Sequence, residues 1–198
     1  SAEVASYEDA AKYAVNCLSE FGGLDAVDPD GWKWFCNKSL IDGLGATSEN
    51  PKEIIWRGNV DESNTLETDN YPPSLYGSGK INPTQNDAKN PYQNRDPRLA
   101  AYILVNGDKI GSTDGVVNTA ADSKTLDGLN KENGKSTKTG YYLRKLLRPD
   151  VNLNPSSATK QKHLSARIRT TEILLDYAEA ANEAQGPKAN VGGANYSA

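Results

Sequence analysis

The sequence predicts a mainly α-helical protein with long loop-rich insertions and a small β element. Two segments, 6–21 and 166–185, repeat apolar residues at the helical period. The stretch 57–97 is rich in Asn, Asp, Pro, Gly and Ser, which are the residues of turns and loops. Short apolar runs of strand length give the third observation; they lie at 53–56, 100–105 and 141–147.

Composition limits the classes of function. The 198 residues are enough for about one domain with a core of its own. They carry a net charge of −4, their mean hydropathy is strongly negative, and they contain no long apolar run. We therefore expect no transmembrane segment and no nucleic-acid partner. The cysteines Cys17 and Cys36 are too few for a disulfide framework.

The first helix is expected over 6–21, with Ser6 and Asp9 able to cap its start and Gly22 and Gly23 ending it. Its apolar face is rich in alanine, with charged residues opposite. The run at 53–56 is expected to be a buried strand or extended segment.

Two further helices are expected. A short one follows Pro29, because proline suits a first helical turn. The clearer one covers 166–185 and is stopped by Gly186 and Pro187. Alanines on the buried faces of both long helices would let neighbouring helices approach closely, as in helical-hairpin repeat proteins.

The residues that could serve in catalysis or metal binding do not occur at the spacings that known catalytic or metal sites require. His163 is the only histidine and lies in a polar stretch, so a solvated or helix-capping role is expected. The chain has too few histidine and cysteine residues, at any spacing typical of zinc sites, to bind zinc. Residues 150–154 begin like a calcium loop, but Pro155 stands where glycine is needed, which favours a polar turn. Asp61 and Glu62 are adjacent and are expected in a solvated turn. We assign no catalytic residue, metal or cofactor.

Aromatic residues in loops are the remaining positive signal. Tyr and Trp offer flat apolar faces that suit stacking on sugar rings, while neighbouring polar side chains bond the hydroxyls. Tyr71 and Tyr76 lie among prolines and glycines, where burial in a core is harder, whereas Trp56 is expected in the core. The candidate ligand-binding residues are Tyr71, Tyr76, Asn70, Asn64 and Trp32.

Five motifs occur in order along the chain. They read EIIW, NPTQ, NRDPRL, TGYYLRK and IRTTEILLDYAEA, at 53–56, 82–85, 94–99, 139–145 and 168–180. In this order they resemble the SusD/RagB family of nutrient-binding outer-membrane lipoproteins. The resemblance implies a SusD-like α-α superhelix of tetratricopeptide-like helices with loop-rich insertions.

The resemblance also implies a function. The protein would bind glycans or oligosaccharides without catalysis, for polysaccharide utilisation by a Bacteroidetes-type bacterium. It would be a surface-exposed lipoprotein of the outer membrane and would deliver its ligand to a SusC-like TonB-dependent transporter. Family glycan sites are built from loops, and 56–83 is the equivalent place here. Arg95, Asp96 and Arg98 match motif positions that we interpret as a loop-fixing ion-pair cluster.

Relatives are longer and begin with a signal and a lipidated cysteine, so an incomplete SusD-like domain is expected over 1–198. Its parts would be helices with the short buried run (1–56), a loop-rich ligand-facing region with the small β element (57–165), and the final helix and tail (166–198). Two other functions stay open. One is a helical-repeat module that binds a protein partner through its alanine-lined helices, without a sugar site. The other is a glycoside hydrolase that uses Asp61 or Glu62.

Overall fold

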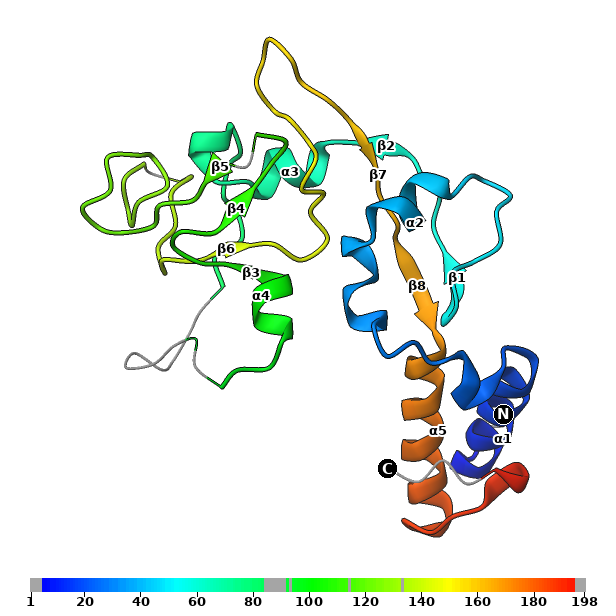
Figure 1. The fold of residues 1–198 in the computed structure, drawn as a ribbon. Coiled ribbons are helices and arrows are strands. Elements are labelled where there is room, and N and C mark those ends of the chain that lie inside the picture. The colour runs from blue at the N-terminus through cyan, green and yellow to red at the C-terminus, as the bar shows by residue number, and fades with distance from the viewer. Residues whose placement is uncertain (1–4, 84–91, 93, 114, 133, 195–198) are drawn as a thin grey trace. The chain divides into compact units, whose positions relative to one another are not determined.

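A computed structural model describes residues 5–83, 92, 94–113, 115–132 and 134–194. The chain divides into two compact units, each built from segments that are separate in the sequence. Unit 1 consists of Ser1–Gly31, Gly45–Asn59 and Leu164–Ala198, and unit 2 of Trp32–Leu44 and Val60–His163. Among the described residues more lie in helices than in strands, as the sequence predicted (Figure 1).

The two long helices, α1 (Tyr7–Glu20) and α5 (Thr170–Gln185), pack side by side in unit 1 (Figure 1). Their predicted alanine-lined faces form the contact. The buried cluster between them and the following turn contains Ala11, Leu18, Tyr177, Ala180, Ala181, Ala189 and Val191. Small side chains at the contact let the two helices approach closely.

The predicted cap of α1 is confirmed. The Oγ atom of Ser6 accepts a hydrogen bond from the backbone N–H of Asp9, and the Asp9 carboxylate accepts one from the backbone N–H of Ser6, each 3.1 Å long. This capping box satisfies two amides that the helix itself leaves without partners. After the helix, Gly22 has a φ of 85°, in the left-handed region that favours glycine.

The predicted run at 53–56 forms strand β1 (Ile54–Arg57), which pairs antiparallel with β8 (Ala166–Arg169). The backbone groups of 166–169 therefore pair with β1. The prediction of a helix over these four residues is wrong. Trp56 is 60% exposed, so its predicted core position is also wrong. The strand register is irregular on both sides of Trp56, which breaks the alternation of faces.

The remaining helices are short. The helix predicted after Pro29 is a 3₁₀ segment, η2, that is kinked at Lys33. The other α-helices are α2 (Lys38–Gly43), α3 (Thr65–Asn70) and α4 (Arg98–Tyr102). The 3₁₀ helices are η1 (Gly23–Ala26), η2 (Gly31–Cys36), η3 (Pro73–Leu75) and η4 (Val191–Gly193). Among the described residues, no helix is both long and apolar enough to cross a membrane.

Unit 2 holds the small β element as three two-stranded antiparallel ladders. They pair β2 (Glu62–Ser63) with β7 (Gln161–Lys162), β3 (Ile103–Leu104) with β6 (Tyr142–Leu143), and β4 (Lys109–Ile110) with β5 (Gly115–Val116). The predicted runs at 100–105 and 141–147 thus supply one strand each and pair with one another. Strands β3 and β4 do not form a hairpin across the turn after Val105, because β4 pairs with β5.

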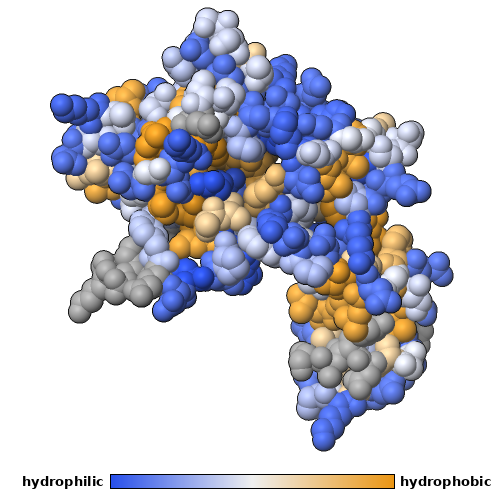
Figure 2. Space-filling view, viewed as in Figure 1, coloured by the Kyte–Doolittle hydropathy of each residue, from blue (hydrophilic) through white to orange (hydrophobic). Residues whose placement is uncertain are grey.

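Strands β3, β4 and β6 contribute to a core of seven buried residues: Tyr71, Leu104, Ile110, Val117, Tyr142, Leu147 and Val151. Leu75 and Leu153 pack at its edge. The expectation that Tyr71 avoids burial is wrong, because only 1% of it is exposed. Over the visible face of the protein, hydrophilic side chains predominate and apolar ones show between them (Figure 2).

Candidate functional site

A pocket of about 190 Å³ lies in unit 2 where three loop segments meet. The segments are the turn after α3, the tip of the β4–β5 hairpin, and the loop 151–157. The pocket is lined by Tyr71, Ser74, Leu75, Tyr76, Gly111, Ser112, Thr113, Val151, Asn152, Leu153, Asn154 and Ser157. It therefore combines part of the apolar core with a polar rim.

Tyr71 and Leu75 belong to the floor of the pocket. The Tyr71 hydroxyl donates a hydrogen bond to the backbone carbonyl of Arg148. Burial raises the pKa of the Tyr71 hydroxyl well above its ordinary value, with a further contribution from the Glu67 carboxylate, so the group stays neutral. Because its ring is buried and its hydroxyl engaged, Tyr71 supports the pocket and offers no open face for stacking.

Tyr76 lies at the rim with 57% of its surface exposed. It follows η3, and its backbone N–H donates to the carbonyl of Pro73 over 3.0 Å. Its φ of 66° is uncommon for a residue with a side chain. Since positive φ in such residues is a local strain that the surrounding structure must maintain, the turn fixes the backbone of Tyr76 at the rim of the pocket.

The loop 151–157 is stabilised by its own asparagines. Asn152 Oδ1 accepts from the backbone N–H of Asn154, and Asn154 Oδ1 accepts from that of Ser156, each over 3.0 Å. Asn152 Nδ2 also donates to Ser157 Oγ. The predicted polar turn at 150–154 is confirmed by these bonds, which are typical of Asx turns. The Nδ2 group of Asn154 has no partner among the described residues, so it can donate to a ligand.

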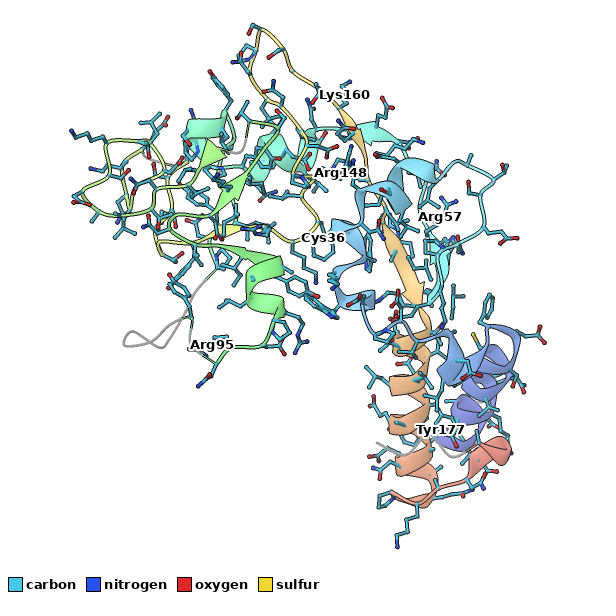
Figure 3. All side chains as sticks on the ribbon, in the orientation of Figure 1. Cys36, Arg57, Arg95, Arg148, Lys160 and Tyr177 are labelled. Atoms are coloured by element: carbon cyan, nitrogen blue, oxygen red, sulfur yellow. The ribbon has the colours of Figure 1, made fainter. Side chains whose placement is uncertain are left out.

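Arg148, labelled in Figure 3, holds the beginning of this loop in place. Only 1% of its surface is exposed. Its guanidinium donates two hydrogen bonds of 2.9 Å to the Asp150 carboxylate and one of 2.9 Å to Asp42. A fourth bond reaches the carbonyl of Lys162. Charge-assisted bonds with this fork geometry are among the stronger ones in proteins. They tie the loop of the pocket to α2 and β7.

Glu67 extends the same network. Its Oε1 atom accepts from the backbone N–H of Arg148 over 2.8 Å and lies 2.9 Å from His163 Nε2. The other ring nitrogen of His163 lies 2.9 Å from the carbonyl of Gln161. The predicted solvated or capping role of His163 is therefore wrong: the imidazole is mostly buried and bridges α3 to β7.

The network predicts a loss of stability in acid. Burial raises the pKa of the Asp150 carboxyl, but the hydrogen bonds from Arg148 and Lys38 outweigh this effect and lower it from 3.8 to about 2. Because the folded pKa is depressed, the stabilisation is present above pH 3.8 and is lost as the pH falls towards 2. Urea unfolding at several acidic pH values should show this loss.

Asp150→Asn provides the comparison for this measurement, since the amide does not titrate. The difference in unfolding free energy between the natural protein and the variant should shrink as the pH falls through this window. A difference that stays constant from pH 5 to pH 2 would contradict the role of the Asp150 carboxylate.

A second hollow, of about 470 Å³, has a charged lining. It includes Arg95, Asp96, Asp108 and Arg144 beside apolar residues of α4. Next to this hollow, Arg98 donates to the Asp96 carboxylate over 2.7 and 2.9 Å, so two members of the expected cluster of Arg95, Asp96 and Arg98 form an ion pair. Both side chains of this pair are more than half exposed. We place the candidate ligand site in the smaller pocket, which contains predicted residues.

Of the five candidate ligand residues, Tyr71 and Tyr76 line the smaller pocket. The other three lie elsewhere in unit 2. Asn70 is buried, and its Nδ2 donates to the carbonyl of Leu66. The Nδ2 group of Asn64 donates to the carbonyl of Thr159. Trp32 packs edge-on against Tyr102 at 6.4 Å between ring centroids.

Four polar residues that line the pocket are not among the candidates predicted from the sequence: Ser112, Asn152, Asn154 and Ser157. The stretch 152–157, which reads NLNPSS, carries a signal that could have found three of them. It concentrates turn-forming residues with side chains that bond hydroxyl groups. Nothing in the sequence around Ser112 distinguishes it from other loop serines.

The model of the SusD family matches residues 52–196. The chain belongs to the SusD family. This confirms the resemblance found in the sequence, and the sequence motifs after residue 52 lie within the matched range. No curated protein matches the chain.

Two solved structures from Bacteroides fragilis share the fold of this SusD family member. One is a SusD-like protein with 21% identity and a TM-score of 0.62; the match covers 90% of this chain and 40% of that one. The other is a SusD-like carbohydrate binding protein with 20% identity and a TM-score of 0.55, covering 91% and 40%. The predicted fold class is thereby confirmed. The chain spans 40% of the length of each of these two proteins.

Proposed function

We propose that this chain takes part in capturing glycans, which it binds and does not cleave. The observation that carries the proposal is the pocket at Tyr76, where an exposed aromatic ring stands beside hydroxyl and carboxamide groups. A sugar offers an apolar ring face and a set of hydroxyl groups. The pocket supplies a partner for each of them.

The hydrogen-bonding groups around Tyr76 are held in place before any ligand arrives. Asn154 is positioned by its bonds to Ser156, and the loop that carries it is anchored through Arg148. Ordering these groups in the free protein reduces the entropy lost on binding. The arrangement therefore suits capture of a ligand from dilute solution.

The same pocket supports binding without reaction. Among its described lining residues there is no carboxylate, histidine, lysine or cysteine that could transfer a proton or attack a sugar. Asp61 and Glu62, the pair considered for hydrolysis, are exposed neighbours at the start of β2 and do not line the pocket. A glycoside hydrolase is thus poorly supported.

The alternative of a protein-binding module is less well supported, because part of the surface on which it rested is covered. Ala11, Ala180 and Ala181 are buried between α1 and α5, so these alanines are already covered within unit 1. Because they are not available to a partner, we favour glycan binding.

We further propose the setting that SusD family membership suggests. The protein would be a surface-exposed lipoprotein of the outer membrane and would pass its glycan to a SusC-like TonB-dependent transporter. Support comes from the family match and from the neighbour whose description is a SusD-like carbohydrate binding protein. Co-purification of the full-length protein with such a transporter from outer membranes would test this step.

Replacing Tyr76 by Ala is expected to weaken glycan binding at least about tenfold, the equivalent of about 1.4 kcal/mol. Removing the ring takes away both its buried area and the contact of its face with the sugar. Isothermal titration of the full-length protein against a panel of oligosaccharides would measure the change.

Tyr13→Ala is the matched control, because Tyr13 is an exposed tyrosine of α1 in unit 1 and does not line the pocket. It should leave the affinity unchanged. Equal affinities for the natural protein and Tyr76→Ala would remove this site from the proposal, and failure of every glycan to bind would overturn the function.

A further inference from the structure

The polar groups of the pocket are uncharged. Among the described residues that line it, the polar side chains are hydroxyls and carboxamides, such as those of Ser112 and Asn154, and none is ionised. This differs from the second hollow, which contains arginine and aspartate side chains. These two hollows therefore suit ligands of different charge.

A buried carboxylate is bonded to one of the residues that line the pocket, Ser74. Asp127 is fully buried, and its carboxylate accepts from the backbone N–H of Ser74 over 2.8 Å and from Ser74 Oγ over 2.5 Å. The Ser74 hydroxyl donates its one hydrogen bond to Asp127. Towards a ligand, this hydroxyl can therefore only accept a hydrogen bond, for example from a ligand hydroxyl. An anion has no proton to offer at this position and would meet the field of the carboxylate.

The buried cation beside Tyr71, Arg148, does not compensate for this field. The Arg148 guanidinium is bonded to Asp42 and Asp150, and what it presents towards Tyr71 is its backbone carbonyl. A ligand carboxylate entering the pocket would lose part of its hydration and gain no opposite charge among the described lining residues. An uncharged hydroxymethyl group would not bear this cost.

The volume limits how much of a ligand enters. Pockets for drug-sized molecules begin at about 300 Å³. A pocket of about 190 Å³ suits a smaller fragment, such as one sugar ring of a longer chain. The identity of that one ring would then decide whether the chain binds.

We infer that the pocket at Tyr76 accepts one uncharged sugar unit and discriminates against uronic acids and sulfated sugars. The inference rests on the proposed glycan capture and adds the chemical class of the ligand. It predicts an affinity that is insensitive to salt, because no charge pair is screened.

The test uses pairs of oligosaccharides that share length and linkage and differ only at C6, where one member carries a carboxylate and its carboxyl-reduced counterpart a hydroxymethyl group. Titration calorimetry with the full-length protein, over pairs of several linkages, gives both affinities. We expect the neutral member of a bound pair to bind at least about tenfold tighter, with the same affinity at low and high salt.

Two variants assign this discrimination to the pocket. Ser112→Lys places a cation at the rim, and Ser112 Oγ has no hydrogen-bond partner among the described residues that the change would break. Ala158→Lys adds the same charge at an exposed position that does not line the pocket. Ser112→Lys should reduce the preference for the neutral member several-fold, whereas Ala158→Lys should leave it unchanged.

The outcomes separate the two proposals. If acidic members bind as tightly as neutral ones, or if salt weakens the binding of neutral members, the inference is overturned while glycan capture stands. Equal effects of the two lysine variants would also overturn it. If no member of any pair binds, glycan capture fails and the inference fails with it.

Discussion

Replacing Arg148 by Met should lower the free energy of unfolding of unit 2 by about 3–5 kcal/mol. The side chain is 1% exposed, and its loss would leave the Asp150 carboxylate, itself largely buried, without its principal partner. Methionine fills a similar volume, so the effect would come from the lost charge and hydrogen bonds. Urea unfolding followed by tryptophan fluorescence measures the change in a Trp56→Phe background, where the remaining tryptophans, Trp32 and Trp34, both lie in unit 2.

Arg98→Met is the matched control for this prediction. Arg98 also makes two hydrogen bonds to one aspartate, but both partners are largely exposed, and such pairs contribute little to stability. We expect almost no change in unfolding. If both variants unfolded at the same urea concentration as the natural protein, the Arg148 network would not be a stabilising one.

The Arg148 variant also has a functional consequence. Arg148 fixes Asp150 and Lys162, which lie on either side of the loop that carries Asn152 and Asn154. A looser loop should bind glycans more weakly even where the protein stays folded. The affinity should fall together with the stability.

The sequence predicted those parts of the fold that are determined locally. The capping box of α1 needs only Ser6 and Asp9, three residues apart, and the end of the helix needs only glycine at 22. The alanine-lined faces of the two long helices follow from their period. These features depend on interactions within a few residues, so the pattern contains them.

Features that depend on distant partners were predicted incorrectly. Residues 166–169 continue the apolar period of α5, but β1, more than a hundred residues earlier, recruits them into a strand. His163 lies in a polar stretch, yet its partner Glu67 is 96 residues away. Tyr71 is flanked by turn residues and is nevertheless buried, because it packs in a cluster with residues distant in the sequence, such as Leu104 and Tyr142. Tertiary contacts overrode the local signal in each case.

The candidate site was predicted in part for the same reason. Tyr76 could be found because exposed aromatic residues in a loop suggest binding. Ser112 and Asn154 belong to other loops, which β4–β5 pairing and the Arg148 network bring to the same place. A single sequence does not contain that proximity. Trp32 had the right chemistry but lies against Tyr102, away from the pocket.

Gly77→Ala is expected to damage both the stability of unit 2 and the pocket. A Cβ atom at Gly77 would lie 2.1 Å from the carbonyl oxygen of Tyr71 and 2.5 Å from its carbonyl carbon. These are backbone atoms, so no rotation of a flexible side chain relieves the overlap. Overpacking of this kind costs about 1–3 kcal/mol, and here the backbone that positions Tyr71 and Tyr76 must move. Urea unfolding and glycan titration should both register the change.

Gly43→Ala separates this steric effect from the general effect of replacing glycine. Gly43 is the last residue of α2, and a Cβ atom there meets nothing within 4 Å. Alanine favours helix over glycine by up to about 1 kcal/mol, so this variant should be as stable as the natural protein or slightly more stable. The two substitutions therefore have opposite expected signs within the same unit. If Gly77→Ala were as stable as the natural protein and bound glycans equally well, residue 77 would not lie close to the Tyr71 backbone. The turn that positions Tyr76 would then lose its structural basis.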